Sequence, residues 1–516
     1  MTPVERWGAA ALGLLMGLVV AGVAAASPDQ VRIHDGALKG VVGDGVASFK
    51  DIPFAAPPVG DLRWRAPQRP APWRGVRDAS DYGPACLQMT TFLVRPGVAQ
   101  SEDCLTVNVF TPARRAPGAK LPVMVWIYGG AFIGGSANNY DGTKFAQDGV
   151  VLVTFNYRLG RLGFFAHPAL ANTNPEGALS DYGFADQIAA LKWVRRNIAA
   201  IGGDPGKVTI FGESAGAISV NYLLVSPKAR GLFIRAGSES GFGRTGGHPL
   251  ADAETTGAAF IKGLGVTGDD AAAAKAMRAL PASAVMAPIS GLGDPGTGPI
   301  IDGVVVSESP GEGFAHGDQA RVAYLTGGNS FEASLFPNVA SHPEAVLDRL
   351  GPGKDAAVAL YGNGDPAKAA AALTTLRAVI EPDRYLAREN AKRGIATYVY
   401  YFSYVPQADR ATSMGVRHGG EIGYVFDTLP KTDMTYGRYH VSAATPADES
   451  IARATHAYWV AFGKTGRPGA AGGPRWPRAE PGDMVLEFGD DGPVVRPDFD
   501  RAKLDPITAR AGTTRQ

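Results

Sequence analysis

Ser214 lies at the centre of the stretch with the clearest chemical pattern. A short apolar run, residues 208–211, leads into Gly212-Glu213-Ser214-Ala215-Gly216, and a helix-forming run follows. This G-x-S-x-G pattern between a strand and a helix is typical of a nucleophile elbow, a tight turn that exposes the serine hydroxyl. The small residues beside Ser214 suit such a turn. An ordinary glycine-rich turn has the same pattern, so the catalytic interpretation requires a base, an acid and an oxyanion site elsewhere.

His418 is the best candidate for the base among the four histidines that lie far downstream of Ser214. It follows a strand-like run that ends near Tyr404, and the glycines around it suit a loop that approaches a nucleophile closely. The remaining three are His342 and His440, in polar stretches, and His456, inside a predicted helix. A base is needed because a serine hydroxyl is a weak nucleophile until its proton is taken.

Glu332 and the segment Gly129-Gly130-Ala131 complete the candidate machinery. Glu332 lies on a loop after the strand-like run 322–326, where α/β sheets place their sites, and would accept a hydrogen bond from His418 Nδ1. The Gly129-Gly130-Ala131 loop follows a buried strand and can direct backbone N–H groups at one point, and with the N–H of Ala215 it offers up to three donors for the oxyanion of a tetrahedral intermediate. The alternatives are a solvated glutamate and a turn that merely needs glycine.

The elements that must position these residues alternate between strand and helix. Three apolar runs predict buried strands, at residues 121–128, 150–157 and 208–211. With a helix predicted over 186–198, this alternation indicates an α/β fold with a central, mostly parallel sheet flanked by helices. Two Ala-rich blocks, about 249–299 and 343–392, predict helical excursions that cap the active site. Residues 27–516 are predicted to form one domain that frays after about Asp505.

Residues 1–26 are predicted to be a cleaved signal peptide. Arg6 precedes an unbroken apolar run at residues 8–23, and three alanines provide a cleavage site after Ala26. A membrane anchor is the alternative, but the run is short for a span of about 20 residues. Export to the periplasm or the medium is therefore expected, with no membrane attachment after cleavage. In an exported protein Cys86 and Cys104 suggest a disulfide rather than free thiols or part of a metal site.

Composition limits the possible partners. The chain has 50 Lys and Arg against 49 Asp and Glu, scattered along its length, which is unfavourable for binding nucleic acid. Its sequence has no His/Cys cluster and no Asp-rich loop, so neither a metal nor a cofactor is expected. The oligomeric state stays open.

These motifs resemble those of type-B carboxylesterases, the family of bacterial para-nitrobenzyl esterases, mammalian carboxylesterases and cholinesterases. The matching segments run along nearly the whole mature chain, at residues 54–60, 62–64, 102–105, 126–132, 156–158, 186–187, 202–205 and 212–216. The resemblance implies the α/β-hydrolase fold, with Ser214 as nucleophile, Glu332 as acid and His418 as base. It also implies oxyanion donors, which are Gly130, Ala131 and Ala215.

The resemblance further implies a Cys86–Cys104 disulfide, an Arg63–Glu102 ion pair near it, and Ser240 as a residue that supports the triad. The chain departs from the family in two places. Ala131 replaces the third glycine of the oxyanion loop, and its N–H can donate only if its backbone suits an L-residue. No tryptophan lies between the cysteines, where cholinesterases stack one on their cationic substrate, which argues against choline esters.

Together these observations predict an exported, cofactor-free serine hydrolase that cleaves small-molecule carboxylic esters through an acyl-enzyme on Ser214. A lipase, thioesterase or amidase on the same scaffold is the first alternative, because these enzymes share the acyl-enzyme chemistry. A non-catalytic binding protein is the second alternative. The presence of Ser214, Glu332 and His418 together argues against it.

Overall fold

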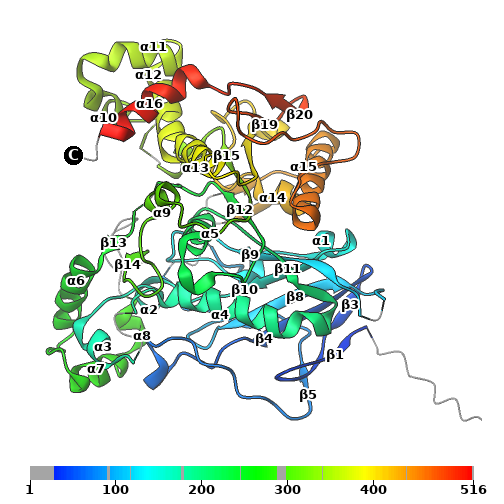
Figure 1. The fold of residues 1–516 in the computed structure, drawn as a ribbon, viewed down its shortest axis with the longest axis vertical. Helices are drawn as coiled ribbons and strands as arrows, with labels where there is room; N and C mark the ends of the chain where they lie inside the picture. The colour runs from blue at the N-terminus through cyan, green and yellow to red at the C-terminus, as the bar shows by residue number, and fades with distance from the viewer. Residues whose placement is uncertain are drawn as a thin grey trace, which may run out of the picture.

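An eleven-stranded sheet forms the centre of the protein (Figure 1). The structure is a computed structural model that describes residues 28–89, 93–116, 118–175, 179–244, 246–286, 298–336, 338–339, 341–436 and 439–513. The predicted signal peptide, residues 1–26, lies outside the described residues.

The sheet is mostly parallel, as the alternation of strands and helices predicts. Its strands follow the spatial order β20-β19-β16-β15-β12-β11-β9-β10-β8-β4-β3. From β10 to β19 neighbouring strands pair in parallel, and antiparallel strands close both ends. The bounds are β3 Val41–Gly43, β4 Val46–Pro53, β8 Thr106–Pro112, β9 Leu121–Ile127, β10 Val151–Phe155, β11 Gly203–Glu213, β12 Arg235–Glu239, β15 Ala323–Asn329, β16 Thr397–Phe402, β19 Val485–Gly489 and β20 Gly492–Arg496.

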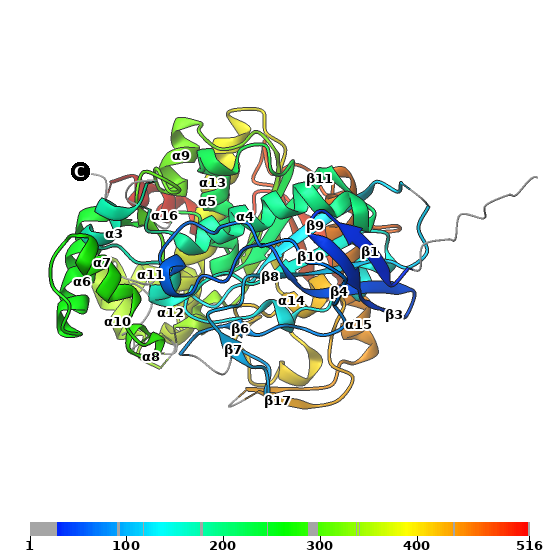
Figure 2. The same cartoon turned by 90° about the horizontal axis from the view of Figure 1, so that it is seen from below.

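Helices cover both faces of this sheet (Figure 2). One face carries α4 (Tyr182–Asn197), α5 (Ala215–Val225) and α13 (Glu381–Ala391), and the other carries α14 (Ile422–Phe426) and α15 (Pro446–Thr465). Because helices lie on both sides, the central strands have no solvent-exposed face, and every residue of β10 is buried. This burial explains why the central strands are almost continuously apolar in sequence.

Both Ala-rich blocks are helical, and they lie at different levels along the long axis of the molecule (Figure 1). The first contains α6 Leu250–Gly263, α7 Ala271–Arg278 and α8 Ala282–Val285, while residues 287–297 lie outside the described residues. The second contains α10 Glu344–Leu347, α11 Lys354–Gly362 and α12 Pro366–Thr375 before α13. Ala333 N donates to Thr375 Oγ1 at 3.1 Å, so the second block packs against the segment that carries Glu332.

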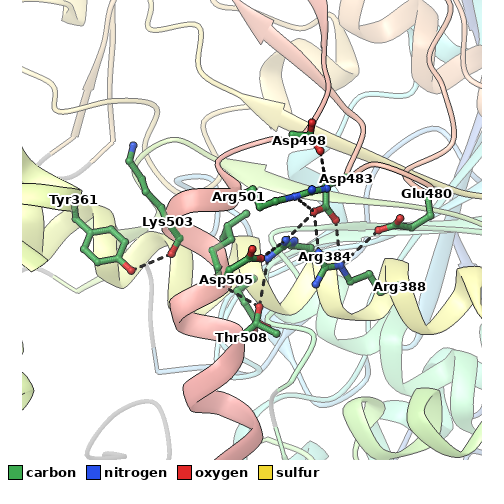
Figure 3. Close-up of polar contacts among 12 residues, drawn as sticks. Tyr361, Arg384, Arg388, Glu480, Asp483, Asp498, Arg501, Lys503, Asp505 and Thr508 are labelled. Atoms are coloured by element: carbon green, nitrogen blue, oxygen red, sulfur yellow. Dashed lines mark hydrogen bonds and ion pairs between the residues drawn. The ribbon is translucent and has the colours of Figure 1, made fainter.

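The prediction that the chain frays after about Asp505 is wrong. Residues from Arg501 to Thr513 form helix α16, whose Leu504 and Ile507 side chains are buried. Figure 3 shows the polar contacts that hold this helix: Arg384 Nη2 of α13 lies 2.6 Å from Asp505 Oδ1 and 2.7 Å from Asp483 Oδ2. Helix α16 is held by a charged partner on α13 and by its own buried apolar side chains. The short local sequence of α16 does not indicate these contacts.

The predicted cross-link near the N-terminus is present. Cys86 and Cys104 form a disulfide, and Arg63 Nη2 lies 2.6 Å from Glu102 Oε1, which forms the ion pair that the resemblance implies. Across the described part of the chain, no helix combines the length and the apolar character that crossing a membrane requires.

Candidate active site

Ser214 lies in a strained turn between β11 and α5. Its backbone has φ 57° and ψ −124°, a conformation that L-residues rarely adopt and that costs about 1–3 kcal/mol. The flanking glycines are required by close packing, because a Cβ on Gly212 or Gly216 would lie 2.4 Å or 1.9 Å from the carbonyl oxygen of Ile127. Ser214 N donates to Glu239 O at 2.9 Å, which fixes the turn to the next strand. The geometry is that of a nucleophile elbow.

His418 and Glu332 are brought together by two loops that pair with each other. His418 Nδ1 lies 2.5 Å from Glu332 Oε2, and His418 N donates to Ser334 Oγ at 2.9 Å. Glu332 is fully buried and follows β15, at the strand end where it was predicted. Because Nδ1 is engaged by the Glu332 carboxylate, proton exchange with a nucleophile would use Nε2, which in this structure lies near Glu213 Oε1.

Ser240 contacts the Glu332 carboxylate directly. Ser240 Oγ donates to Glu332 Oε1 at 2.6 Å, and Asn329 N donates to the same oxygen at 2.6 Å. One oxygen of Glu332 therefore accepts two hydrogen bonds, and the other faces His418. This arrangement orients the carboxylate toward His418.

The loop after β9 packs directly on the elbow. A Cβ on Gly129 would lie 2.9 Å from Ser214 Cβ, so the loop and the nucleophile are in contact. Ala131, the departure from the family pattern, has φ 55°, in the left-handed region that favours glycine. An alanine there is tolerated at a cost of roughly 1–2 kcal/mol. The N–H groups of Gly130 and Ala131 thus belong to a loop next to Ser214, whose own neighbour, Ala215, begins α5.

Two further buried carboxylates reach this site, and the sequence interpretation missed them. Glu213 Oε1 lies 3.1 Å from His418 Nε2, and Glu421 Oε2 accepts a hydrogen bond from Asn329 Nδ2 at 2.6 Å. Both lie next to motif residues, because Glu213 is the variable residue of the elbow motif and Glu421 lies three residues after His418, but the sequence does not show that their side chains are buried.

The pKa values of this carboxylate cluster are strongly shifted. Burial raises the pKa of Glu213 to about 8, against the His418 charge and with help from Glu421. Burial and the Glu332 charge raise the pKa of Glu421 to about 7. Burial acts to lower the pKa of His418, but the charges of Glu213 and Glu332 outweigh it and raise that pKa to about 10. The cluster therefore exchanges protons around neutral to alkaline pH.

The other downstream histidines have different surroundings. His456 is buried in α15, with Nδ1 2.7 Å from Val425 O and Nε2 3.2 Å from Asp148 Oδ2. His342 is exposed beside Glu344. The side chain of His440 lies outside what the structure describes.

One group in the described part of the chain has the spacing of a metal site. Ligand atoms of Glu308, His316 and Asp318 lie within 4.8 Å of one another, on and around α9 (Pro310–His316). His316 and Asp318 are exposed, and His316 Nδ1 already lies 2.9 Å from Glu308 Oε2. This arrangement is that of a polar pair at the surface. Among the described residues, none of the three contacts Ser214, Glu332 or His418.

The fold and site together have the form of an α/β-hydrolase: a nucleophile elbow after a central parallel strand, with an acid and a histidine on loops after later strands. Among solved structures, a PNB esterase has a TM-score of 0.77 and 31% identity, covering 93% of this chain and 100% of that one. A carboxylesterase of Geobacillus stearothermophilus has a TM-score of 0.78 and 32% identity, covering 92% and 100%.

Sequence comparison gives the same result. The sequence profile of the carboxylesterase family matches residues 27–350 and 362–496. The fumonisin B1 esterase of Sphingopyxis macrogoltabida is 36% identical over 93% of this chain and 91% of its own. The human cocaine esterase is 33% identical over 94% and 92%. The chain belongs to the carboxylesterase family and is a carboxylic ester hydrolase.

Proposed function

We propose that the protein hydrolyses small-molecule carboxylic esters through a covalent acyl-enzyme on Ser214. His418 Nε2 takes the proton of Ser214 Oγ as that oxygen bonds to the ester carbonyl carbon. The carbonyl oxygen becomes an oxyanion, which is bound by the N–H groups of Gly130, Ala131 and Ala215. The bond to the alcohol oxygen then breaks, and the alcohol leaves with the proton from His418. Water, deprotonated by His418, then attacks the acyl carbon. His418 returns that proton to Ser214 Oγ as the bond between Oγ and the acyl carbon breaks, which releases the acid and free Ser214.

The continuous hydrogen bonding from Ser240 through Glu332 to His418 is the observation that carries this proposal. Glu332 accepts from Ser240 on one oxygen and lies 2.5 Å from His418 Nδ1 on the other. A buried carboxylate so held fixes the histidine tautomer and stabilises the imidazolium that forms when Ser214 is deprotonated. A non-catalytic binding protein has no need of a buried carboxylate paired with a histidine, together with a strained serine turn.

The names of the relatives support an ester of a small organic molecule. Fumonisin B1 esterase and cocaine esterase are both named for such substrates. Lipase, thioesterase and amidase activities use the same acyl-enzyme chemistry, so the acyl and alcohol groups that fit the pocket decide between them. Comparing kcat/KM for p-nitrophenyl esters of rising acyl length with a thioester and an anilide of the same acyl group separates these activities.

We also propose that the protein is exported after cleavage at Ala26, and that residues 27–516 form one domain. The Cys86–Cys104 disulfide supports an oxidising compartment, because disulfides are rare where thiols are kept reduced. The match to the carboxylesterase family begins at residue 27, immediately after the predicted cleavage site. Mass spectrometry of the N-terminus of protein recovered from the periplasm or medium tests this proposal, and an intact N-terminus on that protein would overturn it.

Ser214→Ala tests the catalytic assignment. The variant should lower kcat/KM for p-nitrophenyl butyrate by roughly 10⁴-fold or more, because the acyl-enzyme cannot form. It should also lose labelling by an alkyl fluorophosphonate, which in the wild type should modify the peptide that contains Ser214. Ser341→Ala, at an exposed serine whose Oγ donates to Asn338 O, is the matched control and should keep both properties. Wild-type turnover by folded Ser214→Ala, or labelling at another residue, would contradict the assignment.

A further inference from the structure

A cleft with positive charge lies beside α4. It has a volume of about 410 Å³, within the range of small-molecule binding pockets. One wall is α4, with Ala189, Lys192 and Arg196 at helical spacing along the same face. Residues 66–69, in the proline-rich loop 66–72, also line the cleft. No residue of the proposed catalytic machinery lines this cleft.

Cations from three separate segments converge on the cleft. They are Arg69 of the proline-rich loop, Lys192 and Arg196 of α4, and Lys228 of the 3₁₀ turn Pro227–Ala229. Among the described residues, the only carboxylate in an ion pair with any of them is Asp35, whose Oδ1 lies 3.9 Å from Arg69 Nη2. This local excess of positive charge stands out in a chain with a net charge of only +1.

Arg196 is the cation that lacks compensation most clearly. Its Nε is buried and has no hydrogen-bond partner among the residues that the structure describes. Burial, and next the neighbouring charge of Arg69, lower the pKa of Arg196 against the opposing effect of Asp35. A buried guanidinium N–H without an acceptor, beside a second guanidinium, is costly unless an anion supplies the acceptor.

The cleft also has an apolar floor, which a solvated patch of surface lysines lacks. Phe54, Leu179 and Val305 line it, and each of these side chains is buried. An inorganic anion or a nucleic acid backbone would make no apolar contact with this floor. The floor and the cations together fit a molecule with an apolar body and an anionic group.

We propose that this cleft binds a small organic anion, with a phosphate or carboxylate group between Arg69, Lys192 and Arg196. The apolar body of the ligand lies on Phe54 and Val305. The phosphate or carboxylate accepts the hydrogen bond that Arg196 Nε leaves unmade. This binding site is separate from the site of ester hydrolysis and does not depend on the role of Ser214.

Titration calorimetry with 1-naphthyl phosphate, 1-naphthoate, 1-naphthol and inorganic phosphate tests this proposal on the full-length protein. At least one of the two naphthyl anions should bind roughly tenfold more tightly than 1-naphthol and than inorganic phosphate. Only the naphthyl anions combine an apolar ring that packs on the floor with a negative group that pairs with the cations. Binding of the naphthyl anion should weaken as salt is raised. Binding of 1-naphthyl phosphate alone identifies an organic phosphate site, and binding of both anions identifies a site for organic acids in general.

Two variants and a control locate the binding. The double variant Lys192→Gln/Arg196→Gln should weaken binding of the naphthyl anion roughly tenfold or more. Ala189→Glu should abolish it, because a carboxylate introduced one turn before Lys192 on the same helix face would offset the positive charge of the cleft. Arg195→Gln removes one charge from the same helix, but Arg195 Nη1 donates to Gly231 O outside the cleft, so binding should not change. Undiminished binding in the double variant, or equal loss in Arg195→Gln, would overturn the proposal, as would failure of both anions to bind more tightly than 1-naphthol.

Discussion

Glu213→Gln should separate two effects of one charge on His418. Glu213 Oε1 lies 3.1 Å from His418 Nε2. At that separation, with an effective dielectric constant of about 20, a carboxylate and an imidazolium attract each other by roughly 5 kcal/mol. An attraction of that size favours the protonated histidine by several pKa units. Because Glu213 itself titrates with a pKa of about 8, only part of this effect is expressed when both groups exchange protons.

The expected result follows from the need for neutral His418 as the base. The charges of Glu213 and Glu332 raise the pKa of His418 to about 10 against the effect of burial, so activity should fall as pH drops below the pKa of the cluster. Removing the Glu213 charge should move the acid limb of kcat/KM to lower pH by about one to two units. The same loss removes stabilisation from the imidazolium formed in the transition state, so the alkaline plateau should fall by roughly tenfold to a hundredfold. The wild-type and variant profiles should therefore converge at low pH.

The assay is p-nitrophenyl butyrate hydrolysis from pH 5 to 11.5, corrected for spontaneous hydrolysis, so that the range extends above the His418 pKa of about 10, with Glu239→Gln as the matched control. Glu239 is buried in the same region, and burial raises its pKa well above the ordinary value, which favours its neutral form. Its Oε1 accepts from Trp459 Nε1 at 2.7 Å, which a glutamine oxygen can also do. Glu239→Gln should therefore leave the acid limb in place. A plateau that falls in Glu213→Gln without any shift of the acid limb would refute this electrostatic reasoning.

Two other perturbations test the local energetics. Ala131→Gly should raise the free energy of unfolding, measured by urea titration, by up to about 1 kcal/mol. Glycine relieves the strain of φ 55°, and its greater conformational entropy in the unfolded chain offsets part of the gain. A loss of stability would contradict the presence of this strain. Asp483→Asn should lower the free energy of unfolding by about 3 kcal/mol at pH 7, because Arg384 and Arg388 lose their shared partner. Burial acts to raise the pKa of Asp483, but the hydrogen bonds from Arg384 and Arg388 outweigh it and lower that pKa. The stability that Asp483 contributes is therefore fully present above about pH 4 and is lost as pH falls through the lowered pKa. The two proteins should therefore converge in acid, and a constant difference would contradict this.

The sequence was sufficient for the parallel sheet because burial on both faces requires continuous apolar runs, and such runs are visible in residue types. It also predicted that His418 and Glu332 would meet, since both follow strands whose carboxyl ends share one edge. The cluster formed by Glu213 and Glu421 was not predicted, because a charged residue next to a motif gives no sign of whether its side chain points inward. The order of α16 was missed for a related reason: its partners lie on α13, more than 100 residues earlier.

The ends of consecutive strands position the candidate residues one after another. Ser214 N donates to Glu239 O at the end of β12, and Ser240 N donates to Gly327 O in β15 at 2.7 Å. The parallel ladder thus continues past the strands and holds both serines, whose φ angles are 57° and 55°. Serine is not a residue type that predicts a left-handed backbone conformation. The strain at Ser214 and Ser240 is therefore imposed by the sheet rather than by the local sequence. A change at the carboxyl end of β12 or β15 should therefore alter catalysis without contacting the substrate.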